Sequence, residues 1–171
     1  MKGTALPVLT AKPSCYPPSC ASLCIPLLDL LGSALPTSPG PILSVGCGAG
    51  LLEALLLLHH PPLAAHLRGV EILHVNRFLP DDVVLRANGT WHIVGEAREA
   101  VALLFIYPRE TKLVKAYLDA AAKAGVVVWI GPRRDFEEYG AVLASWGEDT
   151  TQGQADKVVE PYERLAVFVR R

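Results

Sequence analysis

Residues 41–53 read Pro-Ile-Leu-Ser-Val-Gly-Cys-Gly-Ala-Gly-Leu-Leu-Glu. A short apolar run ends in three glycines at alternate positions, Gly46, Gly48 and Gly50, and a second apolar run over residues 51–58 follows at once. This pattern predicts a strand, a tight turn and a helix. Glycine suits both a chain reversal and a place where a ligand lies against bare backbone. The N–H groups in the first turn of the new helix then face that ligand.

The composition of the 171-residue chain is that of one globular domain. Apolar residues make up 51% and charged residues 19%, which excludes general disorder. The formal net charge of −1 argues against a nucleic-acid partner, because phosphate binding needs a basic surface. No apolar run reaches the roughly 18–20 residues that span a bilayer, and the amino terminus lacks the continuous apolar core of a signal peptide. We therefore expect no membrane association and a cytoplasmic location.

The cysteines and paired histidines do not form a recognisable metal motif. Cys15, Cys20 and Cys24 cluster, but no second ligand group follows at zinc spacing. His59 and His60 stand in the predicted last turn of the helix, where imidazolium suits the helix dipole. Four cysteines are also too few for a disulfide scaffold of this length. We expect reduced thiols and no metal site.

The first 40 residues differ from the rest of the chain. Four prolines among residues 1–18 predict an irregular arm, and an apolar run over residues 25–31 predicts a helix with Pro26 in its first turn. We therefore divide the chain into an arm and helix, residues 1–40, and an α/β domain, residues 41–171. The arm either covers a ligand-binding mouth or binds another chain, as a homodimer contact or a contact with a partner protein.

Further apolar segments have the order expected of an open parallel sheet with crossover helices. The predicted strands after the first are residues 69–74, 90–94, 102–106 and 126–130. Residues 156–160 and 164–169, around a turn at Pro161, predict an antiparallel hairpin. The fold class is therefore α/β: a seven-stranded, mostly parallel, Rossmann-like sheet with a C-terminal antiparallel hairpin and helices on both faces.

The glycine spacing and the strand order together resemble the class I S-adenosylmethionine (SAM)-dependent methyltransferases over residues 40–171. The dinucleotide-binding fingerprint is G-x-G-x-x-G, whereas Gly50 follows Gly48 by only two positions. The sixth strand of a dinucleotide-binding Rossmann fold is also parallel, not part of a hairpin. Both features disfavour an NAD-dependent dehydrogenase.

The resemblance implies a SAM site at the carboxyl ends of the strands. Glu71, at the end of the second predicted strand, would accept the ribose hydroxyls. In that family a glycine-acid-alanine triplet similar to Gly95-Glu96-Ala97 meets the adenine amino group, and a helix N-cap region is the equal alternative here. The implied cofactor residues are Gly46, Cys47, Gly48, Ala49, Gly50, Glu71, Ile72, Glu96, Ala97 and Tyr107.

Methyl transfer requires that the acceptor be held in line with the methyl group, roughly 3–3.5 Å away. A base helps if the acceptor is a hydroxyl or a thiol. His74, just beyond Glu71, is the candidate base, and Tyr107, at the carboxyl end of the fourth predicted strand, is the candidate positioning residue. His92 is a further candidate base, although a structural histidine on a strand face is the favoured interpretation.

Two departures from the family pattern leave two functions open. Ser44 stands where the family usually has an acid, two residues before the first glycine, and Glu53 or a backbone group is the candidate to compensate. Tyr107-Pro108-Arg109 lacks the amide or acid with which amino-methylating relatives hold their target. The chain is therefore either a SAM-dependent methyltransferase of a small molecule, with an O-, S- or N-acceptor, or a methyltransferase-like protein that serves as a partner subunit or in a non-methylating reaction.

Overall fold

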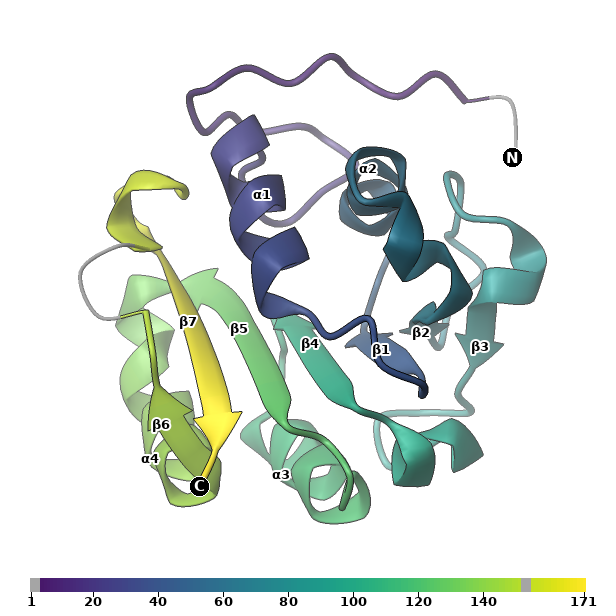
Figure 1. Ribbon diagram of the computed structural model, residues 1–171, viewed down its shortest axis with the longest axis vertical. Coiled ribbons are helices and arrows are strands. Elements are labelled where there is room, and N and C mark those ends of the chain that lie inside the picture. The colour runs from purple at the N-terminus through teal and green to yellow at the C-terminus, as the bar shows by residue number, and fades with distance from the viewer. Residues whose placement is uncertain (1–3, 152–154) are drawn as a thin grey trace.

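The computed structural model describes residues 4–151 and 155–171, so the first three residues of the predicted arm lie outside it (Figure 1). Within these residues, seven strands form one sheet in the order β3-β2-β1-β4-β5-β7-β6. The first five strands pair in parallel, and β7 runs antiparallel to both β5 and β6. The strands are β1 Ile42–Val45, β2 Leu67–Glu71, β3 Val84–Arg86, β4 Ala102–Ile106, β5 Val126–Pro132, β6 Gly147–Asp149 and β7 Glu163–Arg170. The predicted fold class is confirmed.

Helices cover both faces of the sheet, α1 and α2 on one and α3 and α4 on the other (Figure 1). Four α-helices are described: α1 Ile25–Ala34, α2 Leu51–His59, α3 Thr111–Ala120 and α4 Phe136–Trp146. Short 3₁₀ turns occupy Pro61–Ala65, Asp81–Val83, Gly95–Glu99, Arg133–Asp135 and Ala155–Lys157. None of the described helices is long and apolar enough to cross a membrane.

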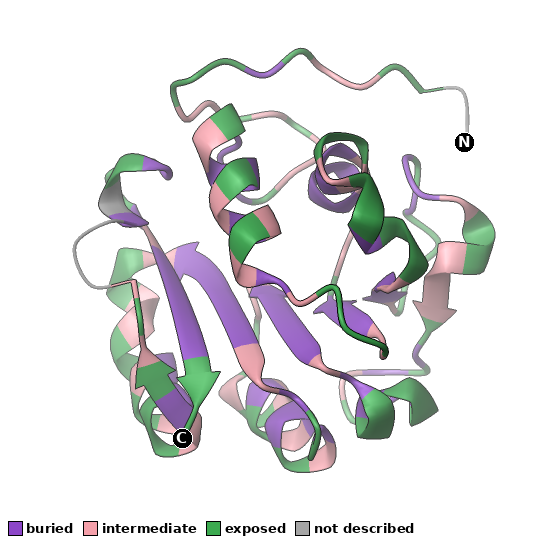
Figure 2. Cartoon of the chain, in the orientation of Figure 1, coloured by how far each residue is buried: buried purple, intermediate pink, exposed green. Residues whose placement is uncertain are grey.

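Successive side chains of each central strand supply two separate cores, because side chains alternate across a sheet. In β4, Leu104 packs with α1 and α2, whereas Leu103 and Phe105 pack with α3 and α4. The central strands β4 and β5 are buried along most of their length, while the outward surfaces of the helices are exposed (Figure 2). Burial on both faces explains why the sequences of β4 and β5 are apolar without alternation.

The third strand lies elsewhere than predicted. Residues 90–94 form a turn and irregular chain, and β3 is instead Val84–Arg86, which pairs with β2 in the register Gly69 to Val84. An edge strand of three residues beside Asp81 and Asp82 carries too little pattern to be recognised. The alternation at residues 90–94 reflects burial of Val94 in the core at the start of a 3₁₀ turn, not strand pairing.

The second and last predicted strands also need correction. Strand β2 ends at Glu71, so His74 lies in a bend beyond the sheet. Besides β5, the strand that pairs with β7 is β6, with Gly147 opposite Arg170, and not residues 156–160. Val158 and Val159 are buried in the core beside α1, so their apolar character comes from helix packing. The antiparallel end of the sheet is confirmed, but the first predicted strand of the hairpin is wrong.

Candidate functional site

The turn between β1 and α2 exposes bare backbone at the carboxyl end of the sheet. Gly46, Gly48 and Gly50 have φ angles of 81°, 56° and 79°, in the left-handed region that favours glycine. A Cβ atom placed on Gly46 or Gly48 would meet no atom within 4 Å, whereas one on Gly50 would lie 2.8 Å from the side chain of Leu79. The first two glycines therefore leave open space above the chain, and the third allows close packing at the start of α2.

Glu71 joins this turn to the end of β2. One carboxylate oxygen accepts the N–H of Gly48 at 2.8 Å, and the other accepts the N–H groups of Ile72 and Leu73 at 2.8 and 3.2 Å. The structure thus brings together the acid and the glycine turn that the sequence predicts as one site. Because a carboxylate offers about four acceptor positions, capacity for a further hydroxyl remains.

A first cleft, with about 300 Å³ of empty space including its open mouth, lies beside Glu71. Apolar side chains dominate its lining, as suits a flat nucleobase. The lining residues are Val45, Gly46, Val70, Glu71, Ile72, Ala87, Gly89, Thr90, His92, Leu113 and Tyr117. His92 belongs to the loop after β3, and its Nδ1 accepts the N–H of Asn88 at 3.0 Å. In the neutral imidazole the proton is therefore on Nε2.

A second cleft of about 350 Å³ lies next to the first, and Gly46 lines both. Its walls are the glycine turn, the first turn of α2, the end of β4 and the arm. The lining residues are Pro18, Ser19, Cys20, Gly46, Cys47, Gly48, Leu51, Leu52, Glu53 and Ile106. The arm contributes residues 18–20 to this lining.

A buried acid stands at the base of the second cleft. The Ser44 hydroxyl in β1 donates a hydrogen bond of 2.5 Å to the carboxylate of Glu53, and both residues are buried. Burial raises the pKa of Glu53 to about 7, against the opposing effect of the Ser44 hydrogen bond. Burial likewise raises the pKa of the neighbouring Cys47 thiol, so this thiol stays protonated near neutral pH. Helix α2 thus carries the acid that β1 lacks.

Glu163 is a functional candidate that sequence reasoning missed. This fully buried carboxylate accepts hydrogen bonds from the backbone N–H and the hydroxyl of Ser22, from the N–H of Glu160 at 3.1 Å and from the hydroxyl of Tyr107 at 2.6 Å. It ties the arm to the carboxyl end of β4. The sequence feature that could have identified Glu163 is an acid at the start of an apolar strand, because a buried charge is unusual unless it is paired.

Tyr107 occupies the end of β4 in a left-handed conformation, with φ of 51°. Its hydroxyl donates to Glu163, and burial together with that bond raises the pKa of the phenol. The hydroxyl proton of Tyr107 is therefore already used in the hydrogen bond to Glu163. Tyr107 lines neither the first nor the second cleft. It lines a third cleft instead.

Several sequence-predicted residues lie outside the two adjoining clefts. His74 is exposed beyond β2, Glu96 is exposed, and Ala97 is buried in the core. The last two follow the predicted third strand, whereas the loop that follows the actual β3 is the one that enters the first cleft. Ala49 supports the turn, since its carbonyl accepts the N–H groups of Arg77 and Phe78.

All four cysteines are free. Across residues 4–151 and 155–171, no three His, Cys, Asp or Glu side chains are grouped as metal ligands. The site itself offers hydrogen-bond acceptors and bare backbone, namely the two acids Glu53 and Glu71 and the glycine turn.

Neither protein-family models nor curated protein sequences show a match to this chain. Many solved structures match its fold. The methyltransferase domain of bacterial CtHen1-CN has a TM-score of 0.56 and 14% identity, covering 85% of this chain and 94% of its own. Magnesium protoporphyrin IX methyltransferase from Synechocystis PCC 6803, solved with SAM, has a TM-score of 0.59 and 12% identity, with coverages of 85% and 79%.

Geranyl diphosphate methyltransferase, solved with GPP and sinefungin, has a TM-score of 0.51 and 16% identity, with coverages of 85% and 76%. The similar structures thus include enzymes of different substrate classes, and the likeness is one of fold. The agreement extends over most of each chain. The protein therefore has the fold of the class I SAM-dependent methyltransferases.

Proposed function

We propose that the protein is a SAM-dependent methyltransferase that acts on a small molecule. The observation that carries the proposal is the pair of adjoining clefts that share Gly46, one with an almost wholly apolar lining and Glu71, and one with a more polar lining and Glu53. SAM divides in the same way, into an adenosine part and an amino-acid part. When bound, SAM supplies a methyl group on a positively charged sulfur, whose C–S electron pair stays on the sulfur after transfer.

The residues of the chain bind and orient. Glu71, held by three N–H groups, accepts a ribose hydroxyl at the end of β2. The apolar lining of the first cleft receives the adenine, and the open backbone at Gly46 and Gly48 lets the ligand lie against the turn. Residues 18–20 of the arm form part of the wall of the second cleft, beside the amino-acid part of the ligand.

Glu53 accepts the ammonium group of the amino-acid part. In this proposal it takes the role of the family's acid at the position of Ser44, and Ser44 orients it from β1. A buried carboxylate without a cation beside it favours its protonated form, and an ammonium group would supply the missing charge. This compensation weakens the main argument for a protein that has lost cofactor binding.

The proposed acceptor is a small molecule because the net charge is −1 and because Tyr107-Pro108-Arg109 lacks the amide or acid that holds a target amine. His74 stays a predicted base for a hydroxyl or thiol acceptor. The free cysteines fit a reducing compartment such as the cytoplasm.

Calorimetric titration with SAM tests this proposal. We expect one saturable site in the wild-type protein, and Glu71→Ala should weaken binding by about 1–3 kcal/mol if the side chain holds the ribose. Glu137→Ala, which removes an exposed acid in the first turn of α4, is the matched control and should leave the affinity unchanged. Absence of heat at millimolar SAM would remove the proposal and favour the alternative, a methyltransferase-like partner subunit or an enzyme of a non-methylating reaction.

A further inference from the structure

A third cleft opens at the carboxyl ends of β4 and β5. It holds about 930 Å³ of empty space, counted with the part open to solvent, and is larger than the first and second clefts. Its lining residues are Tyr107, Pro132, Arg133, Arg134 and Tyr162. Neither Glu53 nor Glu71 is among them, so the proposed cofactor site does not account for this space.

Neighbouring residues at the end of β4 line the second and the third cleft. Ile106 lines the second cleft and Tyr107, the next residue, lines the third. The left-handed backbone of Tyr107 turns its side chain out of the strand pattern, and the hydrogen bond to Glu163 holds it there. A molecule in the third cleft would therefore lie beside the amino-acid end of the proposed cofactor site, where a methyl donor would be.

Two arginines give the third cleft its charge. The guanidinium of Arg133 donates to the carbonyls of Pro161 and Glu163, at 3.3 and 3.1 Å, which fixes its position at the wall. The Arg134 side chain is 87% exposed, and its Nε lies 3.4 Å from a carboxylate oxygen of Asp135. A guanidinium carries five N–H donors in a planar fork, so this pair leaves the terminal nitrogens of Arg134 able to bind an anion.

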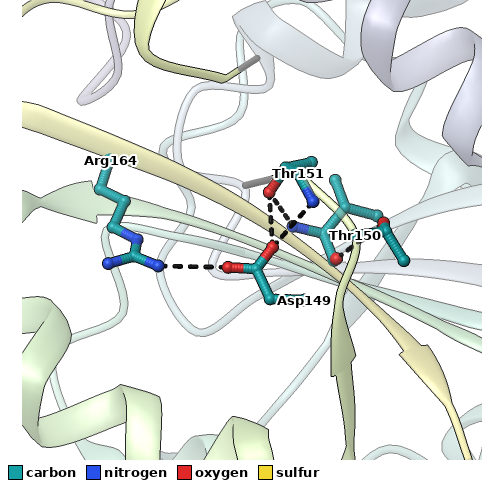
Figure 3. A network of polar contacts seen from close by, with 5 residues as sticks. Asp149, Thr150, Thr151 and Arg164 are labelled. Carbon is teal, nitrogen blue, oxygen red and sulfur yellow. Dashed lines mark hydrogen bonds and ion pairs between the residues drawn. The ribbon is translucent and has the colours of Figure 1, made fainter. Parts of the chain in front are cut away.

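A third arginine nearby, Arg164, has a structural role. Arg164 pairs with Asp149 at 3.1 Å, and Asp149 also accepts the N–H and hydroxyl of Thr151 (Figure 3). The Arg164 guanidinium lies 3.5 Å from the centre of the Phe136 ring. This network joins β6, β7 and the start of α4, and so fixes the wall from which Arg133 and Arg134 project.

Two tyrosines supply apolar surface at the same cleft. The hydroxyl of Tyr107 is bonded to Glu163, and that of Tyr162 lies 3.2 Å from the thiol of Cys15 in the arm. Each ring is thus held by its polar end. The acid beneath them, Glu163, is enclosed by its four donors and is fully buried. The accessible chemistry is therefore guanidinium and aromatic ring.

We propose that the third cleft binds the methyl acceptor, and that this acceptor is a small molecule with a flat apolar body and a carboxylate or phosphate group. The guanidinium fork matches the paired oxygens of either anion, and the tyrosine rings match the flat body. The identity of the ligand as methyl acceptor rests on the proposed function, whereas the anion site rests on the cleft alone. A nucleic acid is disfavoured because two arginines do not make the extended basic surface that a phosphate chain requires.

Binding of probe anions to the full chain tests this inference. The probes are 4-hydroxybenzoate, phenyl phosphate and the neutral 4-hydroxybenzamide, followed by ligand-detected NMR. We expect weak saturable binding of one or both anions, and binding of the amide that is about fivefold weaker or absent. Arg134→Gln should weaken anion binding by about fivefold or more. Arg98→Gln, an exposed arginine in the 3₁₀ turn before the amino end of β4, is the control and should bind as the wild type does.

Equal binding of anion and amide, no binding of either anion, or anion binding that survives Arg134→Gln would overturn the anion site. Tight binding of a single-stranded RNA oligonucleotide that is lost in Arg134→Gln would replace the small molecule by a nucleic acid. SAM titration of the same variant separates this inference from the proposed function, since Arg134→Gln should leave SAM affinity unchanged. If SAM fails to bind while the anions bind, the site stands but its role as acceptor site falls.

Discussion

The Ser44 hydroxyl in β1 and the Glu53 carboxylate in the first turn of α2 form a buried hydrogen bond of 2.5 Å. The pair joins the strand and the helix across the glycine turn. It also places an acid at the base of the second cleft, although the strand position holds only a hydroxyl. The most conspicuous departure from the family pattern is therefore accompanied by an acid nine residues later.

The stability of the unliganded protein should fall as pH rises because of Glu53. Its pKa is raised from 4.5 to about 7 in the folded state, so folding favours the protonated form. The contribution is complete below about pH 4.5 and is lost as pH rises through 7, on the order of 3 kcal/mol for a shift of this size. Urea unfolding of wild type and Glu53→Gln at pH 5, 6, 7 and 8 measures it. Parallel pH profiles for the two proteins would contradict the assignment.

SAM affinity should change with pH in the opposite direction. An ammonium group at Glu53 favours the ionised carboxylate, so binding weakens as pH falls below about 7. We expect a loss of about tenfold between pH 7 and pH 5.5, a range in which an α-amino group stays charged. Calorimetry of wild type and Glu53→Gln provides the comparison, and the variant should bind weakly with a flat profile over this range. If the pH profile of SAM affinity in the wild type equals that of the variant, Glu53 does not bind the ammonium group.

The bare backbone at Gly48 should be needed for the ligand more than for the fold. Gly48→Ala introduces a methyl group that meets no protein atom within 4 Å, but at a φ of 56°. The left-handed conformation costs about 1–2 kcal/mol of stability, while the methyl group would stand in the space reserved for SAM and abolish detectable binding. Gly125→Ala, also in open space but without a left-handed φ, is the control and should retain both stability and binding. Unchanged SAM affinity in Gly48→Ala would show that the ligand does not lie against the turn.

The hydrogen bonds of Glu163 should hold the arm over the second cleft. Glu163→Ala leaves the Ser22 N–H and hydroxyl and the Tyr107 hydroxyl without their acceptor, and buried donors left unpaired cost about 1–3 kcal/mol each. We expect faster proteolysis within residues 4–22 together with the lower stability. Tyr107→Phe removes one donor and keeps the Ser22 bonds, so it should cost about 1 kcal/mol and leave the cleavage rate near that of wild type. Equal cleavage rates in Glu163→Ala and wild type would show that other contacts hold the arm.

Local patterns predicted the parts of the fold that depend on the strand and glycine turn of residues 42–50 and on the long buried strands. β1, α2, β4 and β5 each occupy nearly the residues expected, since burial on both sides demands an uninterrupted apolar run. The edge strands β3 and β6 were missed, because an edge strand of three residues with one partner needs little pattern. In the two segments predicted as strands in their place, Val94, Val158 and Val159 are apolar for another reason, since they are buried in the cores without strand pairing.

The site was predictable where it depends on two strands that are consecutive in the sequence and adjacent in the sheet, and obscure where distant segments meet. The contact between Glu71 and Gly48 follows from the order of two adjacent parallel strands. The position of Glu163 beneath Ser22 and Tyr107 depends on three segments that come together only in the folded chain. The loop after β3 was misassigned for the same reason as the strand itself, and His92 therefore lines a cleft instead of a strand face.

A crystal structure of the protein with S-adenosylhomocysteine tests the central claim most directly. We predict adenine in the first cleft, a ribose hydroxyl within about 3 Å of the Glu71 carboxylate, and the ligand's ammonium group at a similar distance from Glu53. A ligand bound elsewhere would contradict this claim. So would a ligand that crosses the glycine turn without coming within hydrogen-bond distance of either carboxylate.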